Sequence, residues 1–212
     1  DLERRFLDTN GVRVVVDAKV VDKDVKLPEE RTTSADTLEA DTLAVLSDLN
    51  HASQKGLQTI FDCSVGRSTV NHPLGGRYQL TPTEGSVQKL PVQHGVTHTA
   101  SVMAQGFNPY VAEWSPYHGA AYAVIEATAR LVAAGANWSK ARFSYQEYFE
   151  RMDKQAERFG QPVAALLGSI EAQIQLGLPS IGGKDSMSGT FEELTVPPTL
   201  VAFGVTTADS RK

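Results

Sequence analysis

The chain has 212 residues, of which 41% are hydrophobic and 21% are charged, and its formal net charge is -5. This composition is typical of a globular domain, and the acidic balance excludes a general binder of nucleic-acid backbones, which needs a basic surface. A single cysteine, Cys63, excludes an internal disulfide bond and favours the reducing cytoplasm. Since no apolar run approaches the roughly 20 residues that span a bilayer, we expect no membrane partner.

The first part of the chain is predicted to be an arm followed by a helix. Residues 1–31 are rich in charge, and short strands are expected only at Val14–Val16 and Val20–Val21. The spacing of leucines and valines predicts a helix over Thr32–Ser47, with Ser34 as its N-terminal cap. Acidic residues in the first turns of this helix suit its positive end.

The middle of the chain predicts strands joined by turns. β-branched and aromatic residues favour a strand over Leu57–Cys63, and further strands are expected over Ser86–Val92 and Gly95–Met103. Between them, proline and glycine indicate a turn over Asn71–Arg77.

The last hundred residues predict helices that alternate with extended segments. Ser115–Ala134 carries a long apolar stripe, and amphipathic helices are also expected over Tyr145–Phe159 and Pro162–Gly177. A loop over Ser180–Ser188 then leads into a final strand, Thr199–Thr206. Strands that alternate with helices predict an α/β or α+β domain.

The segment Gly182-Gly183-Lys184-Asp185-Ser186 has the residue types of a phosphate-binding loop. Glycines let the backbone approach a ligand closely, and a lysine supplies a point charge that suits phosphate. The upstream glycine and following helix of a Walker A loop are missing, and the motif alone favours an ordinary turn. A stand-alone binding protein for a small phosphorylated ligand is a further interpretation of the same residues.

Glu126 lies within the apolar stripe of the longest predicted helix. A carboxylate that faces a core needs a partner, a metal or a proton, whereas one at the edge of the stripe touches solvent. The helical geometry leaves both interpretations open. The loop Leu74–Glu84 also ends in a carboxylate, and it is interpreted as a hairpin connection in which Arg77 is solvated.

Several unusual strings occur in a fixed order along residues 50–208: FDCSVGRSTV, PLGGRYQLTPTE, SPYHGAAYAVIEATARLVAAGA and ALLGSIEAQIQLGLPSIGGKDSMSGTFEELTVPPTLVAFGV. Together they resemble the long single-chain phosphoribosylformylglycinamidine synthases. The GGKDSMS string followed by PPTL is the most specific part. Because the chain opens at Asp1 and closes on the polar stretch Thr206–Lys212, we expect it to be a piece of a longer enzyme.

The resemblance implies the N-terminal subdomain of the second half of the synthetase core, with an aminoimidazole-ribonucleotide-synthetase-like fold. This fold is a mixed sheet with helices on one face, and two such subdomains pair into a β-barrel. Residues 1–50 are then a connecting arm and helix, and residues 51–212 the subdomain itself.

The resemblance also implies a reaction for the whole enzyme. Formylglycinamide ribonucleotide, ATP and glutamine give formylglycinamidine ribonucleotide, ADP, phosphate and glutamate, with Mg²⁺ at the nucleotide. The expected partners are the other synthetase subdomains and the glutaminase domain of the same chain, and the isolated chain is expected to be inactive. The alternative is a structural or assembly subdomain with a non-catalytic nucleotide site, which can form a homodimer through its open sheet.

Individual residues carry over from the family motifs only in part. The predicted nucleotide-binding residues are Lys55, Asp62, Thr83, Gly182, Gly183, Lys184, Asp185 and Ser186. The predicted metal-binding residues are Glu84 and Glu126. One helical turn after Glu126, where bacterial relatives carry asparagine, this chain has Arg130, a cation that can pair with the carboxylate in place of a metal.

Overall fold

The structure, a computed structural model, describes residues 2–4, 15–21, 34–60, 66–186 and 189–211. The helices in these ranges are α2 (Leu38–Ser47), α3 (Lys55–Ile60), α4 (Pro109–Trp114), α5 (Pro116–Ala133), α6 (Ala156–Leu176) and the 3-10 helix η1 (Trp138–Lys140). The strands are β1 (Leu74–Gly75), β2 (Thr81–Pro82), β3 (Gly85–Lys89), β4 (Thr99–Gly106), β5 (Arg142–Tyr148), β6 (Ser180–Ser186), β7 (Thr190–Phe191), β8 (Leu194–Thr195) and β9 (Thr199–Asp209). Within these ranges no helix has the length and apolar character of a membrane span.

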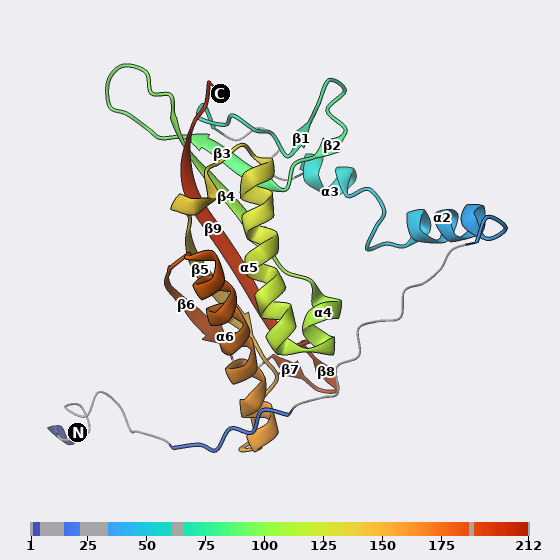
Figure 1. Cartoon of the computed structure of the whole chain (residues 1–212), viewed down its shortest axis with the longest axis vertical. Helices are drawn as coiled ribbons and strands as arrows, with labels where there is room; N and C mark the ends of the chain where they lie inside the picture. The colour runs from blue at the N-terminus through green and yellow to red at the C-terminus, as the bar shows by residue number, and fades with distance from the viewer. Residues whose placement is uncertain (1, 5–14, 22–33, 61–65, 187–188, 212) are drawn as a thin grey trace.

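The centre of the fold is a five-stranded sheet in the order β3-β4-β9-β5-β6 (Figure 1). The pairings from β3 through β4 and β9 to β5 are antiparallel, whereas β5 and β6 run parallel. Parallel neighbours need a long crossover connection, and α6 supplies it between β5 and β6. The predicted mixed sheet is therefore confirmed. The strand pairs β1–β2 and β7–β8 form two small separate sheets.

Helices α5 and α6 cover one face of this sheet, and α5 runs along β4 and β9 (Figure 1). The strands bury every second residue against the helices, as Ala100, Val102 and Ala104 of β4 show. The largest buried side chains of the core include Phe143, Phe149, Leu131 and Leu178. The expectation of helices on one face of the sheet is thus also confirmed.

Glycines allow the helices to approach their neighbours closely. A Cβ atom on Gly168 of α6 would lie 2.7 Å from the carbonyl carbon of Tyr117 in α5. Gly106 of β4 lies equally close to the backbone of α5, where a Cβ atom would be 2.7 Å from the Ala127 nitrogen. Any larger residue at these positions must push a helix away from its neighbour.

The other face of the sheet carries exposed apolar side chains in its central strands. Met103 of β4 is 46% exposed, and Phe203 and Val205 of β9 are 39% and 38% exposed. They alternate with the buried residues of the same strands, so they point away from α5 and α6. This exposed apolar face agrees with the expectation of an open sheet.

The predicted helix over Tyr145–Phe159 is wrong, because its first residues belong to β5 and α6 begins only at Ala156. The burial of Phe143, Tyr145 and Glu147 follows the two-residue period of a strand. The polar composition of this stretch concealed that period. The predicted helix over Pro162–Gly177 is confirmed as the larger part of α6, which begins six residues before the proline and ends at Gly177 in the left-handed conformation.

Two other segments also differ from their predictions. The predicted loop Ser180–Ser188 is the strand β6 as far as Ser186, and residues 187–188 lie outside the described residues. The predicted strand Leu57–Cys63 is helical in its described part, because α3 extends to Ile60. Periodicity alone does not separate a strand from a helix in so short an apolar run.

The N-terminal predictions are met only in part. The helix expected over Thr32–Ser47 begins at Leu38, and Thr37 rather than Ser34 occupies its N-cap position. Residues 15–21 contain no strand, and Val14 lies outside the described residues. Residues 15–21 instead pass beside the start of α6, where the Lys19 amide donates to the Ala156 carbonyl oxygen over 2.8 Å.

The remaining predictions agree closely with the structure. The helix predicted from Ser115 is α5, and the Ser115 side chain caps it by accepting from the His118 amide. Gly135, just beyond its end, has a φ of 80°. The predicted strands in residues 86–103 and 199–206 correspond to β3, β4 and β9 with shifted ends.

Candidate functional site

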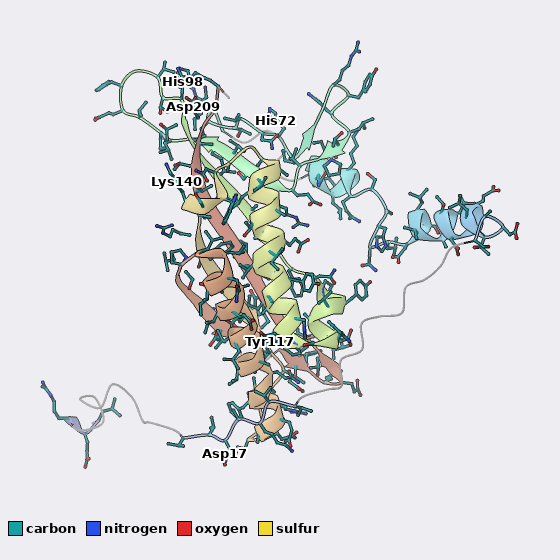
Figure 2. All side chains as sticks on the ribbon, in the orientation of Figure 1. Asp17, His72, His98, Tyr117, Lys140 and Asp209 are labelled. Carbon is teal, nitrogen blue, oxygen red and sulfur yellow. The ribbon has the colours of Figure 1, made fainter. Side chains whose placement is uncertain are left out.

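A short hairpin positions the first group of predicted site residues. Strands β1 and β2 pair, and the chain then returns so that the Thr83 amide donates to the Pro73 carbonyl oxygen over 2.9 Å. The Thr83 hydroxyl donates to the carbonyl oxygen of His72, which Figure 2 labels. Because both bonds hold Thr83 against the start of the hairpin, Glu84 has a fixed place immediately before β3.

Glu84 and Glu126, the two predicted metal ligands, lie on either side of Arg130. The Arg130 Nε atom is 2.8 Å from Glu84 Oε2, and its Nη2 atom is 2.9 Å from Glu126 Oε1. The side chain of Glu126 is 35% exposed, so it lies at the edge of the apolar stripe of α5. Of the two interpretations that the sequence left open for Glu126, the structure supports the one at the edge of the stripe, and there the carboxylate pairs with an arginine.

Glu84 and Arg130 line a cleft of about 660 Å³ at the β3 edge of the sheet, and Glu126 is connected to this cleft through its pairing with Arg130. Its polar lining includes Thr83, Glu84, Ser86, Gln88, Gln105 and Arg130. The apolar side chains of Met103, Phe203 and Val205 continue the lining onto the open sheet face. The cleft therefore joins the predicted ligand residues to the surface on which we expect a partner.

The residues in this cleft do not fit a divalent cation. Mg²⁺ requires oxygen ligands in near-octahedral geometry, and both available carboxylates already bind the guanidinium of Arg130. Among the described residues, no group of three or more histidine, cysteine, aspartate or glutamate side chains is arranged to hold a metal. The expected Mg²⁺ site is therefore not supported by the geometry.

The residues Gly182–Ser186 lie on β6, which forms the opposite edge of the sheet from β3. Gly182, Gly183 and Lys184 are exposed, so their backbone groups on the free side of β6 face outward. The structure therefore brings Thr83, Glu84 and Glu126 to one edge and the glycine-containing segment to the other. Lys55 opens α3 and is exposed, and Asp62 lies outside the described residues.

Glu147 is a buried acid that the sequence analysis missed. It lies in β5 opposite Asp185 of β6 and is only 2% exposed. Burial, and secondarily the hydrogen bond and charge of Asp185, raise the pKa of Glu147 to about 8. At neutral pH Glu147 therefore holds a proton beside the Asp185 carboxylate. Recognising β5 as a strand would have revealed this residue, because period two places Glu147 on the buried face with Phe143.

A second pocket of about 650 Å³ lies at the N-terminal ends of α5 and α6. Its lining includes Val20, Trp114, Ser115, His118 and Gln161. The Ser115 hydroxyl lies 2.9 Å from His118 Nδ1, and the Trp114 and His118 rings are in contact. Because the same hydroxyl caps α5, this serine–histidine pair serves the start of the helix rather than a nucleophilic site.

The mixed sheet with two helices packed on one face defines an α/β class of fold, and solved structures identify the closer likeness. No protein-family model and no curated protein matches this sequence. The structure of PurLQS from Thermotoga maritima is similar with a TM-score of 0.65 and 17% identity, over 92% of this chain and 28% of that chain.

Two further solved structures agree with this likeness. T. maritima PurL complexed with ATP has a TM-score of 0.61 and 15% identity, over 92% of this chain and 27% of that chain. Phosphoribosylformylglycinamidine synthase II from the same organism has a TM-score of 0.52 and 17% identity, over 69% of this chain and 22% of that chain. The chain thus has the fold of part of a PurL molecule and spans less than a third of the length of these structures.

Proposed function

We propose that this chain is part of the synthetase core of a long single-chain phosphoribosylformylglycinamidine synthase, a cytoplasmic enzyme of purine biosynthesis. Within that core it forms the N-terminal subdomain of the second half. The observation that carries the proposal is the agreement of fold over 92% of the chain with 28% of PurLQS. The ordered strings that end in GGKDSMS and PPTL support the same assignment independently of the fold.

In the proposed reaction, ATP transfers its terminal phosphoryl group to the amide oxygen of formylglycinamide ribonucleotide. Ammonia, which the glutaminase domain releases from glutamine, then attacks the activated carbon and displaces phosphate. The products are formylglycinamidine ribonucleotide, ADP, phosphate and glutamate. Phosphoryl transfer of this kind depends on positioning and on electrostatic stabilisation of the phosphate charge.

The part of this chain that suits a phosphate is the β6 edge. Lys184 supplies an exposed positive charge there, and the two preceding glycines leave the backbone open to a ligand. Ser186 adds a hydroxyl group at the end of the strand. Among the strands that the structure describes, β6 pairs only with β5, so we expect the remaining ligands of such a site to come from another subdomain.

A second candidate function is assembly of the synthetase core without nucleotide chemistry in this subdomain. The exposed apolar side chains of Met103, Phe203 and Val205 favour it, because a contiguous apolar surface of this kind marks an interface. The partner in the whole enzyme is the corresponding subdomain of the first half, and the pairing closes the barrel. In the isolated chain the same face can pair two copies into a homodimer.

The test is synthase activity of the full-length protein that contains this segment. We expect formylglycinamidine ribonucleotide to form with glutamine or ammonia, together with stoichiometric ADP, and we expect no turnover by the isolated chain. A full-length protein that hydrolyses no ATP in the presence of formylglycinamide ribonucleotide would overturn the proposed reaction. Turnover by the isolated chain would overturn the need for other subdomains.

A matched pair of lysine variants separates the two candidate functions. Lys184→Ala in the full-length protein is expected to raise the KM for ATP, whereas Lys140→Ala is expected to leave it unchanged. Lys140 is also exposed and lies in η1, which precedes β5 and is not part of the β6 strand (Figure 2). Equal KM values for the two variants would remove β6 from the nucleotide site and leave the assembly role.

A further inference from the structure

The guanidinium group of Arg130 is bound on three sides. Nε pairs with Glu84 over 2.8 Å, Nη2 pairs with Glu126 over 2.9 Å, and Nη1 donates to the Gln105 carbonyl oxygen over 2.8 Å. An arginine side chain has five N–H donors in a rigid plane, so it can satisfy three oxygen acceptors at once. These three oxygens surround a single positive charge, as ligands surround a cation.

The second carboxylate oxygen of Glu126 is also used, because Oε2 accepts from the Phe107 amide over 2.8 Å. The network therefore connects α5 to the end of β4 and to the start of β3. Exposed fractions of the side chains are 24% for Arg130, 35% for Glu126 and 61% for Glu84. The ion pair between Arg130 and Glu126 is thus the better shielded from solvent, whereas solvent screens the contact between Arg130 and Glu84.

We propose that Arg130 is a built-in cation that replaces a divalent metal between Glu84 and Glu126, so the cleft at the β3 edge is a metal-free structural site. Arg130 follows Glu126 by four residues, which places both side chains on the same face of α5. Unlike a metal ion, the guanidinium is covalently part of the chain and carries a delocalised positive charge in a rigid plane. A metal would have to displace it while it remains tethered nearby, and the two positive charges would repel each other.

This arrangement also disfavours a polyphosphate in the same cleft. Two carboxylates and one guanidinium leave the network with a net charge of -1, which repels a polyphosphate, and all three guanidinium nitrogens already bind oxygens of the protein. Nucleotide binding by the β6 edge is unaffected, because that edge lies across the sheet.

The test uses Mn²⁺ as the probe, measured by electron paramagnetic resonance and calorimetry on the chain itself. Wild type is expected to show no saturable binding up to about 1 mM Mn²⁺. Arg130→Asn frees two carboxylates and a carbonyl oxygen, so its Mn²⁺ affinity is expected to rise by about tenfold or more. The double variant Arg130→Asn, Glu126→Gln is expected to lose that gain.

Arg142→Asn is the matched control, because Arg142 is an exposed arginine whose guanidinium donates to the carbonyl oxygens of Lys140 and Ala141. It is expected to bind Mn²⁺ no better than wild type. Circular dichroism checks that each variant folds, and Arg130→Gln, which also removes the charge and has a higher helix propensity than asparagine, replaces Arg130→Asn if that variant unfolds. Saturable Mn²⁺ binding by wild type that Glu126→Gln abolishes would overturn the inference, as would unchanged affinity in a folded Arg130→Asn.

Discussion

Replacing Gly168 by alanine should destabilise the fold through the contact between α5 and α6. The added Cβ atom would lie 2.7 Å from the carbonyl carbon of Tyr117 and 3.1 Å from its Cα atom, with the carbonyl oxygen nearer still. Ordinary contacts between carbon atoms are about 3.5–4.0 Å, so α6 has to move away by about 1 Å. Both sides of the contact are helix backbone, and rotation of a side chain cannot relieve it.

Overpacking of this kind costs about 1–3 kcal/mol, and we expect the upper part of that range because backbone is involved. Alanine in a helix recovers about 1 kcal/mol relative to glycine, which leaves a net loss of about 1–2 kcal/mol. For a chain of this size each kcal/mol shifts the Tm by about 2–4 °C, so the Tm should fall by about 2–8 °C.

Thermal unfolding followed by circular dichroism measures this shift. Gly56→Ala in α3 is the control, because a Cβ atom on Gly56 meets no heavy atom within 4 Å and only the helix propensity changes. Its Tm is expected to stay level or rise. If Gly168→Ala unfolds at the same temperature as Gly56→Ala, the close packing of α6 on α5 does not make a side chain at position 168 destabilising.

Glu147→Gln should remove a pH dependence of stability. The pKa of Glu147 is about 8 in the folded chain and 4.5 for the unconstrained group, so between these pH values the folded chain binds a proton that the unfolded chain has lost. The unfolding free energy of wild type should therefore fall as the pH rises from about 4.5 to about 8. Urea denaturation of both proteins from pH 5 to pH 9 measures the difference, and parallel curves would contradict the assignment. Gly160→Ala should release residues 15–21, because its Cβ atom would lie 2.9 Å from the Val20 nitrogen. Hydrogen exchange at the Lys19 amide should accelerate while the Tm falls less than in Gly168→Ala, and unchanged exchange would refute this.

The elements that the sequence predicted well are those in which local signals agree. Helix α5 has a serine cap, an early proline, an apolar stripe and a terminating glycine, and each points to the same boundaries. β5 lacked such agreement, because glutamine and glutamate occupy positions whose burial depends on the neighbouring strands. Its two-residue period becomes plain only after β9 and β6 pair with it.

Contacts of the candidate site within one helix could be predicted from the sequence, whereas contacts between distant segments could not. The pairing of Glu126 with Arg130 follows from a spacing of four residues within one helix, so it could be anticipated from the sequence. The contact of Arg130 with Glu84 and the proximity of Glu147 to Asp185 join residues far apart along the chain. Such contacts depend on sheet order, which local patterns do not determine.

The strand with the most ligand-like chemistry, β6, is also an edge strand of the sheet. β6 bonds to β5 on one side and is solvent-exposed along most of its length. Its outer amides should exchange with deuterium early, and a neighbouring subdomain that adds a strand there would slow them. The added strand would fix the backbone of Gly182–Lys184 when the subdomains assemble. The affinity for a ligand at β6 would then depend on whether the neighbouring subdomain is in place.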